Sequence, residues 1–554
     1  MFGLHKSTIL IVTAVFSAVL ILLFPLPSTL LLPTFSNLAI LRDLPFVISF
    51  LVTCILFGII WLRHEDRIAM LIFSVFLTVM YTDSWEFKVP NGEFLSTAPN
   101  YASELNLLIS HGHLPGFTIG SPANLLSLVA LRLSAFNSVS TTFWGFSIFY
   151  SVCIGLFVFL LANELVGNER IGALVALLSI LSNPLFISLP DSLYAPRPFG
   201  TLVFLILLYL FVLSYKRNSN ALVPLTILFT LLTVSYVLDA LIFALMMVTV
   251  YMFDLLSSKR RRFVSASGIA ILLNLSILGG WITLNAYTRS FIIGNFFRAF
   301  LINVPSGGVS HPFNLITVLR SHLNSQPLFL DVILFWWLLF VYGIGGLIWV
   351  RSFIVRRSLT TMITAPVILV GILLFFLPGG SEIFRTSNQL SLLLSAAIGI
   401  GILRSSQKIP IILCFLSLLL VLPTMAAYYP NIGSATQYTE SLAAGSYLRY
   451  SVCQPYLLTP AGTSSLDSIP NTTLPGIALT EPEALQYWNN TLRMFFSTQC
   501  AVLNTSQVLY SGFTYTYGAN FTRTFRIMLN DASSEADLVY SNNVTQLYIS
   551  ASST

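Results

Sequence analysis

One stretch in the first 427 residues, 82–117, is neither a long apolar run nor a short basic connector. It follows the apolar run 68–81 directly and carries Asp83, Glu86, Glu93, Glu104, His111 and His113. A carboxylate at the end of an apolar run lies where water gives way to hydrocarbon, a depth at which ionisable groups are costly and mark function. The alternative is a solvated surface loop, which stays open above all for Glu93 and Glu104.

The chemistry that suits Asp83 is general-base catalysis. A carboxylate within hydrogen-bond reach of an attacking hydroxyl accepts its proton while a leaving group departs. Glu86 follows three residues later, so in a helix both carboxylates fall on one face and could share a proton or a metal ion. His111 and His113 give only two possible metal ligands, and no His/Cys metal set, Gly-rich phosphate loop or Ser-His-Asp arrangement accompanies them. We therefore predict no metal site, although a divalent cation as cofactor stays open.

The composition indicates a polytopic membrane protein. Charged residues make up 9%, hydrophobic residues 56%, and the mean hydropathy is +0.83, whereas soluble domains carry about 25% charged residues. Apolar runs of about 18 residues or more recur, which is long enough to cross the hydrocarbon core as helices. The net charge of +6 comes from short connectors and does not indicate a nucleic-acid partner.

The apolar runs predict about thirteen transmembrane helices. They are 8–25, 44–62, 68–82, 141–162, 170–189, 198–215, 221–236, 238–256, 263–284, 327–350, 361–378, 388–403 and 409–427. The first has no small-residue cleavage site after it, so we interpret it as a retained helix rather than a signal peptide. In 221–256 the chain must fold back at Ser235-Tyr236 without a charged turn.

The connectors alternate between short basic ones and longer ones poor in Lys. Fifteen of the 27 Lys and Arg residues lie in the basic set: Lys6, Arg63, Arg67, Arg170, Lys216, Arg217, Lys259 to Arg262, Arg351, Arg356, Arg357, Arg404 and Lys408. The positive-inside rule makes that set cytoplasmic. The amino terminus is then cytoplasmic and the carboxyl-terminal tail extracytoplasmic, in a protein of the cell membrane.

The tail, residues 428–554, is a polar block for which we predict a mixed or β-rich extracytoplasmic domain. It holds the glycosylation patterns of Asn471, Asn489, Asn504, Asn520 and Asn543, which are modified only outside the cytoplasm. It also holds Cys453 and Cys500, which could form a disulfide in an oxidising space or remain two free thiols.

The predicted outer loops 83–140, 190–197 and 285–326 bring carboxylates and arginines to one side. Outside the tail this face carries Lys88 and the arginines Arg42, Arg132, Arg197, Arg289, Arg298, Arg320 and Arg385. Arginine forks bind phosphate well at a low-dielectric boundary. The pattern indicates a substrate with an apolar tail in the bilayer and an anionic head, the alternative being ordinary snorkelling of interfacial arginines.

The sequence resembles the GT-C superfamily of integral-membrane glycosyltransferases over residues 68–285, and more weakly to the end. The matching features are the acidic motif TDSWE after a span, the GHLPGF turn leading to SPANLLSLVALRLSAF, and the NER link before ALVALLSILSNPLFISLPDSLYAPRPFGTLVFLILLYLF. The run FRTSNQLSLLLSAAIGIGI and the closing ADLVYSNNVTQLYIS also match. The resemblance covers protein O-mannosyltransferase, aminoarabinose transferase and oligosaccharyltransferase modules.

The resemblance implies transfer of a sugar from a polyprenyl-phosphate-linked donor to a protein, lipid or glycan acceptor at the outer face of the membrane. The acidic residue that family members carry in their first outer loop corresponds to Asp83, with Glu86 beside it. The acid that some members carry in their second outer loop corresponds to Asp191. The carrier phosphate would be bound by Arg385, with Arg298 as rival. Arg197, His111 and His113 complete the predicted substrate-binding set.

Two departures from the family pattern matter. Two spans precede the module, and the Trp-Trp-Asp motif of oligosaccharyltransferase catalytic subunits is missing. Transfer of a single sugar is therefore expected rather than transfer of a whole glycan to Asn.

We expect four parts along the chain: two amino-terminal spans in 1–67, a GT-C-like module in 68–285, variable spans in 286–427 and the outer domain in 428–554. The alternative function is a lipid or polysaccharide transporter. Polar or ionisable residues in or near spans would support it, namely Asp239, Asp331 and Asn274. A non-catalytic membrane scaffold is a further alternative.

Overall fold

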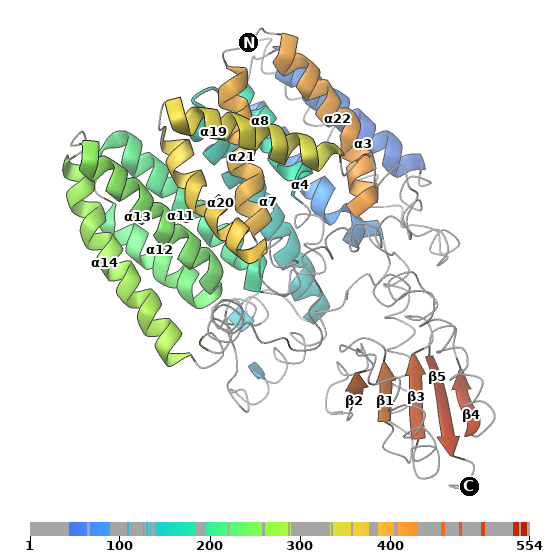
Figure 1. Cartoon of the computed structure of the whole chain (residues 1–554). Coiled ribbons are helices and arrows are strands. Elements are labelled where there is room, and N and C mark those ends of the chain that lie inside the picture. Colours follow the sequence, from blue (N-terminus) through green and yellow to red (C-terminus); the bar gives the residue numbers. More distant parts are fainter. Residues whose placement is uncertain are drawn as a thin grey trace.

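The computed structural model describes a helical bundle and a small sheet (Figure 1). The described residues are 44–63, 67–88, 139–183, 196–219, 221–257, 261–285, 336–355, 358–375, 386–403 and 408–428, five strands beyond residue 455, and a few single positions between these ranges. The predicted first span, 8–25, lies outside them, so the total of about thirteen spans stays a prediction.

Each predicted span from residue 44 onward overlaps a described helix. The helices are α3 (Leu44–Arg63), α4 (Arg67–Lys88), α7 (Val139–Val166), α8 (Glu169–Leu181), α11 (Pro196–Arg217), α12 (Leu222–Ser235), α13 (Val237–Ser257), α14 (Arg261–Leu284), the π-helix η4 (Leu339–Ile344) with α19 (Gly345–Val355), α20 (Leu359–Phe375), α21 (Ser387–Ile402) and α22 (Lys408–Tyr428). Four described helices are long and apolar enough to cross a membrane, and the shorter ones are apolar too. The chain is therefore a membrane-embedded protein.

Two predicted boundaries were wrong. The helix predicted to end at 82 continues to Lys88, so the acidic motif belongs to the helix rather than to a loop. The span predicted over 170–189 ends at Leu181, with Ser182 as its C-cap. Asn183 precedes Pro184, and a residue before proline is sterically excluded from the helical region.

The fold-back predicted at Ser235-Tyr236 is confirmed. Helix α12 ends at Ser235, Tyr236 is extended with φ −153° and ψ 97°, and α13 begins at Val237. A single extended residue reverses the chain here because Gly200 of α11 leaves room for it. A Cβ built on Gly200 would lie 2.5 Å from the Cβ of Tyr236.

The turn between α7 and α8 begins the most buried helix of the bundle. Gly167 takes a left-handed φ of +74°, which glycine adopts at no steric cost. Asn168 then caps α8, its side chain accepting a hydrogen bond from the backbone N–H of Ile171 at 3.0 Å. From Ile171 to Leu181 every residue of α8 is buried, so this helix is the centre of the core.

Basic residues from separate connectors meet at the end of the bundle where α4 and α8 begin, here called the Arg67 end. Arg67 pairs with Glu169 at 3.1 Å and Lys216 with Glu164 at 3.2 Å. The guanidinium of Arg170 lies 4.1 Å from the ring centroid of Trp61. Among the described residues of the basic connectors, Arg67, Arg170 and Lys216 therefore lie on one side.

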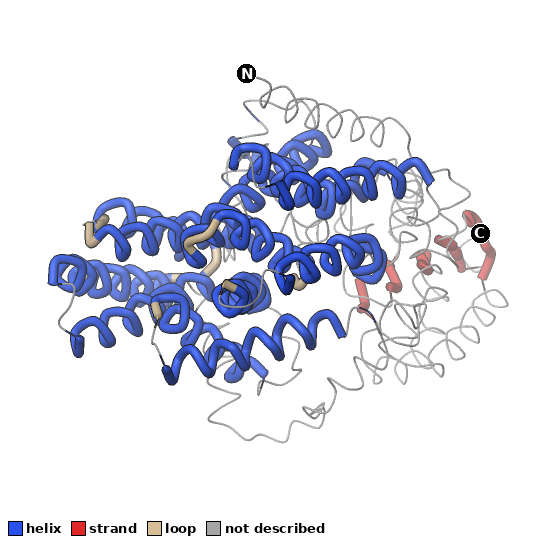
Figure 2. Tube along the Cα trace, turned by 90° about the horizontal axis from the view of Figure 1, so that it is seen from above, coloured by secondary structure: helices blue, strands red, loops and turns tan. Residues whose placement is uncertain are grey.

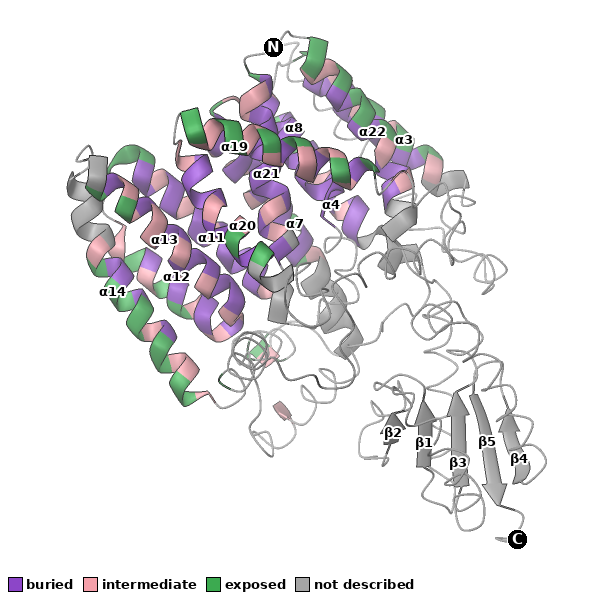
Figure 3. Ribbon diagram, viewed as in Figure 1, coloured by how far each residue is buried: buried purple, intermediate pink, exposed green. Residues whose placement is uncertain are grey.

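The surface helices expose large apolar side chains outward (Figure 3). Leu272 on α14, Leu347 on α19 and Leu419 on α22 are about 70% exposed, at 69%, 71% and 70%. In a membrane these faces contact lipid, where apolar exposure carries no cost.

The described strands of the tail form a mixed five-stranded sheet, and the extracytoplasmic domain predicted for 428–554 stays a prediction. The strands are β1 (Tyr456–Thr459), β2 (Gly476–Ala478), β3 (Cys500–Asn504), β4 (Ala536–Ser541) and β5 (Thr545–Ser550), in the order β2-β1-β3-β5-β4. The closing segment forms the antiparallel pair β4–β5, while β1 pairs with β2 and β3 in parallel. Figures 1 and 2 show the sheet to one side of the helices.

Candidate functional site

The helix α4 carries the predicted catalytic acids on its last turns. Asp83 and Glu86 are three residues apart within a continuous helix that ends at Lys88, so they occupy one helical face. The positions of their side chains lie outside the described part of the chain. The described neighbours of Asp83 fix where this turn lies.

The residue before Asp83 fastens α4 to α7. Thr82 is fully buried, its hydroxyl donates to the carbonyl oxygen of Thr78 at 2.9 Å, and it lies 2.9 Å from the hydroxyl of Ser151. One turn earlier, a Cβ built on Gly155 would lie 3.0 Å from Thr78. The close approach of α7 leaves the last turns of α4 little freedom.

From α7 the contacts lead to the first turns of α11. Tyr150, next to Ser151, meets Phe199 edge to face, with ring centroids 6.1 Å apart. Phe199 lies two residues after Arg197, in a helix that begins at Pro196. The turn that carries Arg197 therefore lies at the same end of the bundle as the turn that carries Asp83.

Three polar side chains join α11 to the start of α21, a group here called the Asn388 cluster: Asn183, Thr201 and Asn388. The side-chain amide of Asn388 donates to the hydroxyl of Thr201 at 2.8 Å. The side-chain amide of Asn183 donates to the side-chain carbonyl oxygen of Asn388 at 2.7 Å. Asn183 is fully buried, and Thr201 is 3% exposed. Asn388 follows Arg385 by three residues, so the cluster places the segment after Arg385 beside α11.

A buried carboxylate lies next to this cluster. The amide of Gln389 donates to Asp239 Oδ1 at 2.7 Å, and the two side chains are 2% and 1% exposed. Asp239 lies in the first turn of α13, where unpaired backbone N–H groups favour negative charge. The helix terminus and the Gln389 amide together offset the cost of desolvating this group.

The end of the bundle assembled by these contacts is here called the Asp83 end. The helices α4 and α8 end there, and α11, α13 and α21 begin there. Two further contacts brace it: the hydroxyl of Tyr342 in η4 donates to the carbonyl oxygen of Ser182 at 3.1 Å, and that of Tyr81 donates to Thr424 at 3.2 Å. The geometry thus brings one acidic turn and one arginine-bearing turn to a common, polar-lined end.

Several predicted site residues lie outside the described part of the chain. They are Asp191, Arg298, Arg385, His111 and His113, with Asn471, Asn489, Asn520, Asn543 and Cys453 in the tail. Arg197 is within α11, Cys500 begins β3 and Asn504 ends it, but their side chains are not described. Their predicted roles stay predictions.

No group of three metal-ligand side chains occurs among the residues that the structure describes. The polar side chains that the structure describes at the Asp83 end are amides, hydroxyls and the carboxylate of Asp239. These groups hydrogen-bond one another in the interior, so they hold the helix ends of this region in place.

The Asn388 cluster and the Asp239–Gln389 pair were not predicted as part of a site. The sequence indicates Asp239 as an ionisable residue near a span. In the run FRTSNQL it points only to Arg385 as a site residue. Three consecutive polar residues opening an apolar helix were the available signal. Their partners could not be foreseen, because they come from three other helices.

The comparisons with known proteins found structural neighbours only. No protein-family model and no curated protein matches the chain. The structure of ArnT from Cupriavidus metallidurans bound to undecaprenyl phosphate is 12% identical, with a TM-score of 0.48, over 88% of this chain and 97% of that one. The apo structure of the same protein is 13% identical, with a TM-score of 0.46, over 89% and 98%.

Proposed function

We propose that the protein is a membrane glycosyltransferase that moves a single sugar from a polyprenyl-phosphate-linked donor to an acceptor hydroxyl. The observation that carries the proposal is the chain of contacts at the Asp83 end. It runs from Thr82 through Tyr150 and Phe199 to Asn388. The helices that bear Asp83 and Arg197 both pack on α7 at this end of the bundle, which supports a proposal of transfer from a lipid phosphate.

In the proposed reaction Asp83 is the general base. The acceptor oxygen attacks C1 of the sugar, the bond between C1 and the phosphate oxygen breaks, and the hydroxyl proton passes to the Asp83 carboxylate. The carrier leaves as polyprenyl phosphate, whose growing negative charge is stabilised by arginine. Arg197 and Arg385 are the candidates, with Arg298 as rival, while Glu86 and Asp191 assist and His111 and His113 contact the sugar. A metal requirement stays open.

The polar groups beside these turns have a positioning role in the proposal. Asn388 links α8, α11 and α21 through two hydrogen bonds of 2.7 and 2.8 Å. Side-chain amides held by such contacts keep their rotamers, and rigid supports preserve catalytic geometry. Asn388 acts through the backbone that carries Arg385 and Arg197, and is therefore a positioning residue.

The proposed orientation follows the charge distribution. The Arg67 end, with its basic connectors, is cytoplasmic by the positive-inside rule, and the Asp83 end faces outward. The amino terminus is then cytoplasmic. The tail 428–554, with its glycosylation patterns at Asn471, Asn489, Asn504, Asn520 and Asn543 and a Cys453–Cys500 disulfide, is an extracytoplasmic domain of a cell-membrane protein.

A transporter accounts less well for the buried ionisable residues. Transporters place such groups near the middle of the membrane, on broken helices. Asp239 instead lies in the first turn of α13, at the end of the bundle. Asn274 does lie within α14, but its amide donates only to the sulfur of Met247 at 3.5 Å, a packing contact rather than part of a polar path.

The test uses lipid that co-purifies with the protein, identified by mass spectrometry. Wild-type protein is expected to carry polyprenyl phosphate, whereas Asp83→Asn retains the sugar-bearing carrier because donor cleavage stops. Asp254→Asn is the matched control, since Asp254 is a buried carboxylate at the Arg67 end that accepts a hydrogen bond from Tyr215 at 3.1 Å. The proposed enzymatic function is overturned if the same fraction of co-purified carrier lipid bears a sugar in Asp83→Asn and in wild type and if glycan transfer is unchanged.

A further inference from the structure

A second feature, at the other end of the bundle, is a pocket of about 720 Å³ between α19, α21 and α22. Its volume is within the range of small-molecule and cofactor sites. The walls are almost wholly aliphatic, with Ile348 from α19, Ile398 and Ile402 from α21, and Ile412 from α22. The described residues that line it include none of the proposed transfer residues.

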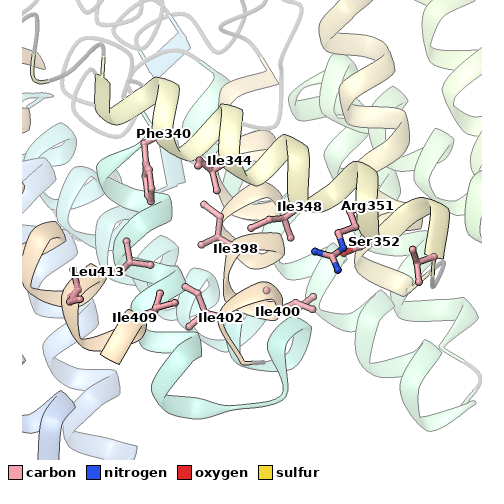
Figure 4. A pocket seen from close by; sticks show the side chains of 13 residues that line it. Phe340, Ile344, Ile348, Arg351, Ser352, Ile398, Ile400, Ile402, Ile409 and Leu413 are labelled. Carbon is pink, nitrogen blue, oxygen red and sulfur yellow. The ribbon is translucent and has the colours of Figure 1, made fainter. Parts of the chain in front are cut away.

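The pocket has one charged end. Arg351 and Ser352 of α19 close it on one side, and Figure 4 shows the guanidinium of Arg351 directed toward the isoleucines of the pocket. No ion pair of Arg351 with a carboxylate occurs among the described residues. A cation at the edge of an aliphatic pocket matches a ligand that has an anionic head and an apolar chain.

Other contacts place the pocket at the Arg67 end. A Cβ built on Gly399 of α21 would lie 3.2 Å from Val166 and 3.3 Å from Ile171, which flank the turn between α7 and α8. Phe353, two residues after Arg351, meets Phe253 near the end of α13, with ring centroids 6.1 Å apart. Arg351 is therefore remote from the end that carries Asp83.

The sequence segments that follow α19 and that join α21 to α22 are basic. Together with the end of α19 they carry Arg351, Arg356, Arg357, Arg404 and Lys408, while the only acid between residues 345 and 428 is Glu382, which precedes the opposite end of α21. Basic connectors alone set membrane topology. Arg351 adjoins an aliphatic cavity, and basic pockets between helices on the cytoplasmic side bind anionic headgroups.

The outer rim of the pocket lies on lipid-facing helix surfaces. Ile412 is 62% exposed and Val355 68% exposed, and both line the pocket. An acyl chain can therefore enter sideways from the bilayer without crossing a polar surface. A soluble anion would gain only the charge contact and would leave the aliphatic walls uncovered.

We propose that this pocket binds one anionic membrane phospholipid, with its headgroup phosphate at Arg351 and an acyl chain along the isoleucines of α19 and α21. The lipid fills the space between α19 and α21 and stabilises their packing. It is a resident lipid of the leaflet at the Arg67 end and is distinct from the carrier used in sugar transfer.

The experiment titrates delipidated, detergent-purified full-length protein with phosphatidylglycerol or with phosphatidylcholine of the same chains, followed by native mass spectrometry. Wild-type protein should bind phosphatidylglycerol at least about fivefold more tightly, since one arginine near a headgroup contributes on the order of that factor. Arg351→Gln should abolish the preference, while Arg351→Lys retains part of it. Arg63→Gln, which removes an exposed arginine at the end of α3, should leave it unchanged.

A second pair of variants tests the aliphatic walls separately from the charge. Ile412→Trp narrows the pocket and should weaken binding of both lipids, whereas Leu419→Trp, seven residues later on the same exposed face of α22 but outside the pocket, should not. Equal affinity for the two lipids, or equal effects of the two tryptophans, overturns the proposal. Displacement of phosphatidylglycerol by equimolar undecaprenyl phosphate also overturns it, since the pocket would then be a carrier site.

Discussion

Gln389 on α21 donates a hydrogen bond to the carboxylate of Asp239 on α13 across 2.7 Å, with both side chains at most 2% exposed. The two residues are 150 positions apart, so this one contact ties the fold-back at Tyr236 to the start of a late helix. A buried carboxylate that loses its donor suffers the full desolvation cost of the missing bond. The pair therefore reports on the integrity of the Asp83 end.

Gln389→Leu should destabilise the protein by about 1–3 kcal/mol, because Asp239 stays buried without the amide. The measurement is the midpoint of denaturant-induced unfolding in detergent micelles. Asn274→Leu is the control: among the described residues its amide donates only to the Met247 sulfur at 3.5 Å, and its side-chain carbonyl oxygen has no partner. Replacing it by an apolar group should be neutral or stabilising. If Gln389→Leu and Asn274→Leu lose equal amounts of stability, the hydrogen bond to Asp239 contributes no specific stabilisation.

Gly200→Ala tests the close approach of α11 to the turn between α12 and α13. The added Cβ would lie 2.5 Å from the Cβ of Tyr236, and neither atom can rotate away. The backbone must shift, at a cost of about 1–3 kcal/mol. The same shift should lower sugar transfer, since Phe199 and Arg197 lie on the displaced turn.

The control for Gly200→Ala is Gly280→Ala in α14, where an added Cβ meets nothing within 4 Å. Alanine is favoured over glycine inside a helix by roughly 0.5–1 kcal/mol, so this variant should be slightly more stable than wild type. A Gly200→Ala protein as stable as wild type would contradict the close approach.

The sequence predicted the helices well because each membrane span needs a long apolar run. The bounds of α3 and α22 were predicted within one or two residues. The wrong boundary of α8 was avoidable, since Asn183-Pro184 marks a helix end. The continuation of α4 to Lys88 was harder to predict from the sequence, because polar helical turns after an apolar run have the composition of a loop.

The site was predictable only in part. The general position of Asp83 follows from the end of an apolar run, and the pair β4–β5 is expected only from the family resemblance of the closing segment ADLVYSNNVTQLYIS. The Asn388 cluster depends on how α8, α11 and α21 pack, which no local pattern specifies. The parallel placement of β1 between β2 and β3 depends likewise on long-range pairing.

Thr82→Val tests whether the contact with Ser151 fixes the turn before Asp83. Valine keeps the shape of threonine but removes the hydroxyl group that lies 2.9 Å from the Ser151 hydroxyl. Thr53→Val is the control, because Thr53 is also fully buried and its hydroxyl donates to the carbonyl oxygen of Ser49 within its own helix. We expect Thr82→Val to be less stable than Thr53→Val by about 1 kcal/mol, and to lower transfer more. If Thr82→Val and Thr53→Val have identical unfolding midpoints and transfer rates, the contact with Ser151 does not fix the turn before Asp83.

Arg197→Gln tests the anionic head of the donor. A hydrogen bond to a charged group contributes about 1.5–3 kcal/mol, so loss of one guanidinium–phosphate contact should raise the KM for the lipid-linked donor by roughly tenfold to a hundredfold. Arg197→Lys should recover part of the loss, since lysine supplies the charge without the bidentate fork. Arg217→Gln is the matched control, because Arg217 ends the same helix that Arg197 begins, at the opposite end of the bundle. If both glutamine variants raise the KM equally, the effect comes from the stability of α11 rather than from phosphate binding.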